Sequence, residues 1–149
     1  MGPAMKTHHQ YISLNTQNGI HISDITPQVN EIINTSGISL GMLTLSSMHT
    51  TLAVTVNEAE ERLLIDIDVY FSKLVPAEAT YLHNDLHLRD VPPDEPENAH
   101  AHLIAMMLGN SESLAIVDSK AVLGTYQSIM TVELDGPRQR QLSLQIMGI

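Results

Sequence analysis

Histidine is the side chain through which this protein could do most chemistry. There are eight histidines among 149 residues, and there is no cysteine. Neutral imidazole is the commonest metal ligand, and three imidazoles with one open coordination position suit catalytic zinc. The lack of cysteine excludes disulfides and thiolate metal sites. Because no tight ligand motif such as HExxH is present, the residue types alone favour the alternative, a set of scattered, hydrogen-bonded histidines.

The histidines belong to different predicted elements. His49 lies on the polar face of a predicted strand, and His83 lies in a long loop. His100 and His102 lie at the start of a predicted helix, where residues two apart point about 200° apart. We therefore expect only one of His100 and His102 to bind any one metal ion, while the other contacts a ligand or a metal-binding side chain.

Five other polar residues are candidates for chemistry, each with an alternative. Glu58 could be a general acid–base, or an acid that stabilises a helix dipole. Arg138 follows a tight turn and could grip a phosphate, or form an ordinary surface ion pair. Gln127 could line a site, or face solvent or another subunit. Asp85 and Asp90 could bind Mg²⁺ together with a diphosphate, or simply be solvated.

Hydrophobic periodicity predicts seven strands and three helices. The predicted strands cover residues 8–14, 20–25, 39–48, 50–57, 114–117, 123–134 and 138–147. The predicted helices run between an N-cap at Thr26 and Gly37, from a capping box of Asn57 and Glu60 to about Val75, and from Asn98 to Gly109. Predicted strands outnumber predicted helices, and many pairs of neighbouring strands are predicted to be antiparallel. The pattern therefore predicts an α+β fold, a mainly antiparallel β-sandwich-like sheet covered by two or three helices.

Two further features concern packing and the site. The predicted buried faces of the first two helices are Val29, Ile32 and Ile33, and then Leu63, Leu64, Ile67, Phe71 and Leu74. Residues 76–97 form a loop with four prolines and many acids. A loop of this length inside a compact domain is usually functional.

The net charge of −10 limits the partners. Such a chain repels nucleic acid and anionic membranes, and no apolar run approaches the ~20 residues of a membrane span. Anionic small molecules remain candidates, although the chain has only seven Lys and Arg residues to bind them. We expect residues 1–4 to be a cloning remnant, residues 5–149 to form a single domain, and the protein to be cytoplasmic.

Several segments resemble the YjbQ-like family, and together they extend from about residue 10 to the C-terminus. They are 49–58 with His-Thr-Thr at its start, 81–85, 97–103, 107–111, 123–127 and 133–138. The chain departs from the family at three places. It has Tyr126 where the family usually has Trp, Ala99 where Gly is common, and Ser119-Lys120 where Gly-Arg is common.

The resemblance implies a fold, an assembly and an activity. It implies an α+β fold with a sandwich-like core, a homotrimer, and a bound divalent metal, most often zinc, at His49, His83 and His102. It also implies a thiamine-phosphate synthase activity, in which a pyrimidine diphosphate and a thiazole phosphate give thiamine phosphate and pyrophosphate. Arg138 would then stabilise the leaving group, with Glu58 and Gln127 as further candidate catalytic residues, and Mg²⁺ could accompany the diphosphate.

Two other functions remain open, and the assembly has independent support. The protein could be a non-catalytic trimer that binds a metal or metabolite, or a zinc hydrolase with Glu58 as base. Two rows of uncharged polar residues on the late predicted strands favour contact with another subunit, because such faces bury no ions. These rows are Thr125, Gln127, Thr131 and Glu133, and Gln139, Gln141, Ser143 and Gln145.

Overall fold

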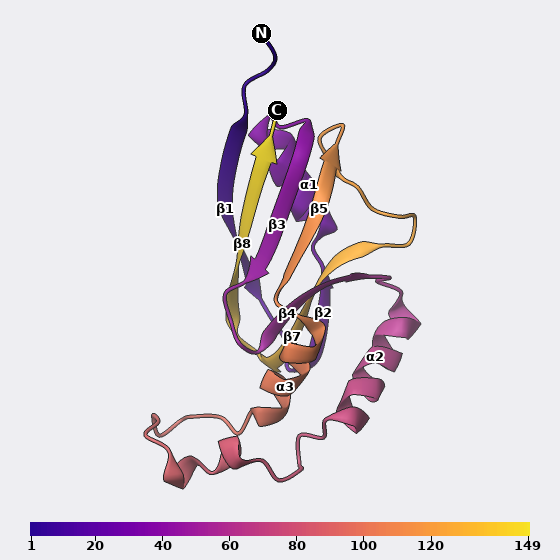
Figure 1. Ribbon diagram of the computed structural model, residues 1–149. Coiled ribbons are helices and arrows are strands. Elements are labelled where there is room, and N and C mark those ends of the chain that lie inside the picture. Colours follow the sequence, from indigo (N-terminus) through magenta and orange to yellow (C-terminus); the bar gives the residue numbers. More distant parts are fainter.

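Two antiparallel β-sheets form the body of the protein (Figure 1). The computed structural model describes residues 1–149. In spatial order, the five-stranded sheet contains β1 (Lys6–Asn15), β8 (Gln139–Gly148), β3 (Leu40–Ser47), β5 (Ser111–Val117) and β6 (Lys120–Ala121). The three-stranded sheet contains β2 (Gly19–Asp24), β7 (Ser128–Gly136) and β4 (Leu52–Asn57). All strand pairs are antiparallel, so the predicted α+β fold is confirmed.

The main hydrophobic core lies between the two sheets and the first helix. Strand β8 shows why this face is buried, because Leu142, Leu144 and Ile146 alternate with polar residues and are fully buried. Leu52 and Val54 of β4 meet them from the other sheet. The alternation of side chains along the strand therefore fixes which face packs inward.

Helix α1 (Thr26–Ser36) confirms its predicted buried face but not its predicted cap. Val29, Ile32 and Ile33 are buried, and the helix ends at Gly37, whose φ of +70° suits glycine. Thr26 lies inside the helix instead of capping it. Its hydroxyl accepts a hydrogen bond from the backbone N–H of Ile129 at 2.9 Å, which ties α1 to β7.

Helix α2 (Glu61–Leu74) begins differently from the predicted capping box. Glu60 is itself the N-cap, and its carboxylate accepts bonds from the N–H groups of Arg62 and Leu63 at 3.0 and 2.7 Å. Asn57 instead accepts a bond from the N–H of Glu58 at 2.7 Å. A glutamate side chain long enough to reach back over the first turn therefore takes the capping role.

Helix α2 also lacks the buried face predicted for it. None of its residues is buried, and Figure 1 shows the helix standing to one side of the sheets. Leu63, Leu64, Ile67 and Phe71 are half-buried, and Leu74 is exposed. Its apolar periodicity is therefore not satisfied by contacts within one chain.

Helix α3 (Ala99–Leu108) packs on the three-stranded sheet and carries His100 and His102. Its buried residues join β4 and β7 in a second, smaller core of Ala53, Ala101, Ile104, Ala105, Val132 and Leu134. Residues 76–97 pass from the end of α2 to the start of α3 and include two short 3-10 turns, η1 (Leu82–Asn84) and η2 (Leu86–Leu88) (Figure 1). Asn84 accepts a bond from the N–H of Ala99 at 3.1 Å, which anchors this loop to α3.

Two predicted strands have different limits in the structure. The strand predicted at 114–117 begins at Ser111, and the strand predicted at 123–134 begins only at Ser128. Residues 124–127 form a turn in which the side chain of Gln127 accepts the N–H of Gly124 at 2.8 Å. None of the helices is long and apolar enough to cross a membrane.

A close approach of backbones between β3 and β8 yields the first prediction. Gly41 lies opposite Gly148, and a Cβ on Gly41 would meet the carbonyl oxygen of Met147 and lie 2.7 Å from the Cα of Gly148. We expect Gly41→Ala to lower the free energy of unfolding by about 1–3 kcal/mol, because the strands must separate to admit the methyl group. Urea denaturation measures the change. The control is Gly124→Ala, where the nearest atom would lie 3.4 Å away, and an equal loss in both variants would contradict the steric explanation.

Candidate functional site

A buried ion pair lies at the end of the sheets that carries His49. Nε and Nη2 of Arg140 donate to the two carboxylate oxygens of Glu133 at 2.7 and 2.6 Å, and both side chains are almost fully buried. Nη2 also donates to the Thr51 hydroxyl at 2.7 Å. Glu133 further accepts the Thr16 hydroxyl at 2.8 Å and the backbone N–H groups of Leu134 and Asp135. Because buried charges must be fully hydrogen-bonded to be tolerated, this network holds both groups in one orientation.

His49 lies next to this pair, on the connection from β3 to β4. Its Nε2 accepts the backbone N–H of Gln141 at 2.9 Å, so the neutral ring carries its proton on Nδ1. Burial and the positive charge of Arg140 lower the pKa of His49 below its ordinary value of 6.5. The ring is therefore neutral at pH 7, but it must release Gln141 before Nε2 could bind anything else.

His83 and His102 lie together at the start of α3. Their ring centroids are 4.8 Å apart, with an interplanar angle of 77°. Burial and the neighbouring His83 lower the pKa of His102. Nε2 of His83 is buried and has no hydrogen-bond partner. Two imidazoles in contact, one of which has a buried nitrogen without a partner, could supply two ligands to a metal ion.

His100 points away from these rings, as helix geometry predicts. It lines a different cavity of about 220 Å³ between α2 and α3, whereas His102 lines the cavities shared with His49. The prediction that only one of His100 and His102 can contact a given ion is therefore consistent with the side-chain directions. Nδ1 of His100 is also buried without a partner.

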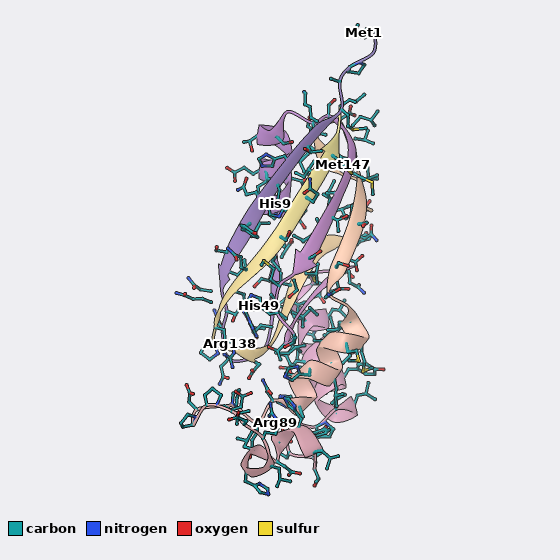
Figure 2. The ribbon with its side chains drawn as sticks, turned by 60° about the vertical axis from the view of Figure 1, so that its left-hand side comes forward. Met1, His9, His49, Arg89, Arg138 and Met147 are labelled. Atoms are coloured by element: carbon teal, nitrogen blue, oxygen red, sulfur yellow. The ribbon has the colours of Figure 1, made fainter.

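An open cleft joins the histidines to the arginines. Two adjoining cavities of about 400 and 410 Å³ share His49, Thr50 and His102 in their walls. The first of these also contains Arg138 and Arg140. Figure 2 shows His49 and Arg138 at the same end of the sheets, above the loop that carries Arg89. We call this 400 Å³ cavity the arginine cleft.

Arg138 forms the ion pair that the sequence allowed, and it does so inside the arginine cleft. Its Nη2 donates to Oδ2 of Asp135 at 3.0 Å, and its Nε donates to the backbone carbonyl of Asp135 at 2.8 Å. The side-chain amide of Asn98 donates to the same carboxylate oxygen at 2.7 Å. The Arg138 side chain remains 42% exposed and lines the cleft, so it is available to a ligand that can replace Asp135.

The predicted three-histidine metal site is not assembled within this chain. No group of three or more His, Asp or Glu side chains is arranged to hold a metal ion. His83 and His102 contact each other, but His49 reaches only the cavity wall it shares with His102, and its Nε2 is already bonded. His83 and His102 are therefore the two predicted ligands that the structure brings into contact.

The other predicted site residues lie away from the cleft. Glu58 follows the end of β4 opposite to His49, and the six residues from Leu52 to Asn57 span roughly 16 Å. It also precedes α2 by three residues, outside the first helical turn. Gln127 lies in the turn beyond the same end of this sheet, since Ser128 pairs with Asn57. The two residues therefore have no contact with the histidines.

Two other acids also lie outside the two cavities. Asp85 and Asp90, proposed as Mg²⁺ ligands, line neither cavity.

Most of the residues that line the arginine cleft had no recognised signal in the sequence. Arg140 carried a detectable signal, because it continues the inward-facing series of Leu142, Leu144 and Ile146 on β8. A charged residue at an inward strand position requires a buried partner. That partner, Glu133, had been assigned to a face toward solvent or another subunit, but it is buried within its own chain.

The network around Glu133 should make stability depend on acidity. Burial alone would raise the pKa of Glu133, but the hydrogen bonds from Arg140, Asp135 and Thr16 outweigh it and lower the pKa below 4.5. The unfolded carboxylate therefore binds its proton first as the pH falls. We expect the free energy of unfolding to decrease as the pH falls below 4.5 through the lower folded pKa. Urea denaturation at a series of pH values measures this, and Glu133→Gln should show a shallower dependence; equal slopes would contradict the assignment.

Known proteins show the same sequence pattern and the same fold. The family described as "UPF0047 protein YjbQ-like" matches residues 10–149. A UPF0047 protein from Methanothermobacter thermautotrophicus is 37% identical over 147 residues, which cover 99% of this chain and 96% of that relative. The crystal structure of a YbjQ-like protein of unknown function from Sulfolobus solfataricus P2 has a TM-score of 0.87 and 35% identity, and covers 98% of this chain and 100% of that one.

A second crystal structure extends the likeness. A hypothetical protein from Aeropyrum pernix K1 has a TM-score of 0.86 at 35% identity, with 95% and 99% of the two chains covered. The family match and the fold extend over the residues that form the cleft. The chain therefore belongs to the YjbQ-like UPF0047 family.

Proposed function

We propose that the arginine cleft binds phosphorylated small molecules and that the protein transfers a pyrimidine group with loss of pyrophosphate. The observation that carries this proposal is the meeting of Arg138, Arg140 and two neutral imidazoles in one cleft. The chain has a net charge of −10 and only seven Lys and Arg residues. Two of these seven residues, Arg138 and Arg140, line a single cavity, which supports an anionic ligand.

The specific reaction is thiamine-phosphate synthesis. The ring nitrogen of a thiazole phosphate attacks the methylene carbon of a pyrimidine diphosphate, forming a C–N bond. The C–O bond to the diphosphate breaks, and pyrophosphate leaves with the electron pair. Arg138 and Arg140 would stabilise the negative charge that develops on the leaving group. His49 and His102, held neutral by burial, would add hydrogen bonds without repelling a cationic ring.

A divalent metal, with zinc as the first choice, would be held by His83 and His102. Such an ion would supply further positive charge beside the phosphate groups. Metal analysis of the purified protein tests this part, and His83→Ala should lower the bound metal. The bond between His49 and Gln141 argues against a third histidine ligand in the same chain.

A non-catalytic binding protein is the second candidate. It is favoured by the absence of a three-ligand group and by the position of Glu58, the predicted acid–base, at the other end of β4. The deciding experiment incubates the protein with both phosphorylated substrates and measures thiamine phosphate and pyrophosphate together. Formation of both in equal amounts supports the transferase. Binding of the phosphorylated substrates without product favours the binding protein.

We also propose that the protein is a homotrimer. Helix α2 leaves Ile65, Val69, Tyr70 and Leu74 between 47% and 62% exposed. A helix with apolar residues on several sides is normally buried in a larger assembly. The outer face of the four strands β1, β8, β3 and β5 carries no Lys, Arg, Asp or Glu, and its central residues are Tyr11, Met42, Thr44, Ser113, Ala115, Ser143, Gln145 and Met147.

The trimer is tested by light scattering. We expect a mass of about three times the 16.4 kDa of one chain, because covering these uncharged and apolar faces removes no ion from water. A lysine in place of Val69 on α2 or Met42 on β3 should lower the mass if that face is covered, and Lys120→Glu, on an exposed edge, is the control. A wild-type mass near that of a single chain would refute the trimer.

A further inference from the structure

The guanidinium of Arg140 is held along one edge and free along the other. Nε and Nη2 donate to Glu133 and Thr51, whereas Nη1 makes no hydrogen bond. The buried polar atoms that lack a partner belong to three other side chains, so Nη1 retains contact with solvent. Arg140 lines the arginine cleft and a neighbouring cavity of about 260 Å³. We propose that this free edge is an oxyanion subsite that binds the phosphoryl group of the ligand, with Glu133 as its positioning residue.

Glu133 fixes where the free edge points. Its two carboxylate oxygens accept both donors on one side of the guanidinium, which prevents the planar group from turning. Its own orientation is set by Thr16 and two backbone N–H groups. A donor that is immobile before the ligand arrives loses little conformational entropy on binding. A buried ion pair adds little to stability compared with apolar side chains, which favours a role in positioning.

The donors in the cleft suit a phosphoryl group better than a carboxylate. Besides Nη1 of Arg140, the walls offer the Arg138 guanidinium, the Thr50 hydroxyl and the ring of His102. Donors on three different residues besides Arg140 match a tetrahedral group with three terminal oxygens, whereas a carboxylate is planar and has two. The cleft volume of about 400 Å³ leaves room for the organic part of a phosphorylated molecule.

Asp135 forms an ion pair with Arg138 in the absence of a ligand. Its Oδ2 accepts bonds from Arg138 and from Asn98, in the position that an anionic oxygen of a ligand would take. A phosphoryl group bound to Arg140 would compete with this carboxylate for Arg138. The fixed arginine therefore supplies the primary contact, and Arg138 is recruited by exchange.

Binding of inorganic phosphate and pyrophosphate tests the subsite without requiring catalysis. In ¹⁵N-labelled protein, the arginine Nε–H signals are followed during titration at constant ionic strength. We expect the Arg140 and Arg138 signals to shift along one saturable curve, while Arg62, exposed on α2, does not shift. An Arg140 signal that stays unmoved while the protein binds the anion overturns the proposal.

Two variants make the test quantitative. Arg140→Lys removes the free guanidinium edge but keeps the charge, and should weaken pyrophosphate binding about tenfold, with Arg62→Lys as the matched control. Asp135→Asn keeps an oxygen for Asn98 but frees Arg138, and should tighten binding about two- to fivefold, a gain that misfolding cannot produce. Unchanged or weaker binding in Asp135→Asn contradicts the exchange, and unchanged binding in folded Arg140→Lys overturns the subsite.

The subsite rests on the proposed class of phosphorylated ligand but not on the reaction. Anion binding at Arg140 in a protein that forms no thiamine phosphate would reject the transferase and retain the subsite. Synthesis of thiamine phosphate with no anion contact at Arg140 would retain the transferase and reject the subsite.

Discussion

Replacing Arg140 with methionine is expected to lower the free energy of unfolding by about 3–5 kcal/mol. The reason is that Glu133 would remain fully buried as a carboxylate with its charge uncompensated. Removing both charges together should cost much less, since apolar side chains of similar size can fill the space. The pair therefore predicts strong coupling in a double-mutant cycle between Arg140→Met and Glu133→Leu.

Urea denaturation followed by circular dichroism measures the four free energies at one protein concentration, because assembly also adds to stability. The melting temperature of Arg140→Met should fall by roughly 6–20 °C for a domain of this size. Arg62→Met, at an exposed site on α2, is the control and should change the free energy by no more than about 0.5 kcal/mol. A loss below about 1 kcal/mol in Arg140→Met would show that the pair is open to water.

Replacing His102 with alanine should give the largest effect on activity. His102 contacts His83 and lines both cavities with His49, so its loss opens the centre of the cleft. We expect thiamine-phosphate formation to fall by about 100-fold or more, the usual effect of losing a positioned catalytic group. The ring is only half-buried, so the free energy of unfolding should change by less than about 1 kcal/mol.

Initial rates with both phosphorylated substrates measure this effect, and denaturation confirms that the variant is folded. His87→Ala is the matched control, since His87 is an exposed histidine on the same loop as His83. Full activity in a folded His102→Ala variant would remove His102 and any metal bound to it from the reaction. Equal losses in both variants would indicate damage to the loop and not to the cleft.

The sequence determined the elements whose signals are local. The alternation in β8 and the stripe of α1 predicted their buried residues, because each pattern reflects the side-chain directions of one element. The angle between His100 and His102 followed from helix geometry in the same way. The end of α1 at Gly37 was also predicted from the sequence, because glycine readily adopts the positive φ found there.

Two predicted helix N-caps and one predicted strand boundary were wrong because several nearby side chains can bond to the same backbone groups. Asn57 and Thr26 are both good caps by type, but Glu60 and Ile25 hold the cap positions. The strand predicted through 123–127 failed because the side chain of Gln127 bonds to the N–H of Gly124 and closes a turn. Periodicity alone does not register such side-chain bonds.

Only the tertiary structure decided which distant residues meet. The bond between Glu133 and Arg140 joins β7 and β8, which belong to different sheets, and the contact of Arg140 with Thr51 joins residues 89 positions apart. His83 meets His102 because a long loop folds back on α3, whereas Glu58 and Gln127 remain at the opposite end of the sheet. Sequence patterns report the direction of a side chain within its own element. The relative placement of elements depends on how their apolar faces pack together, and that packing set the composition of the arginine cleft.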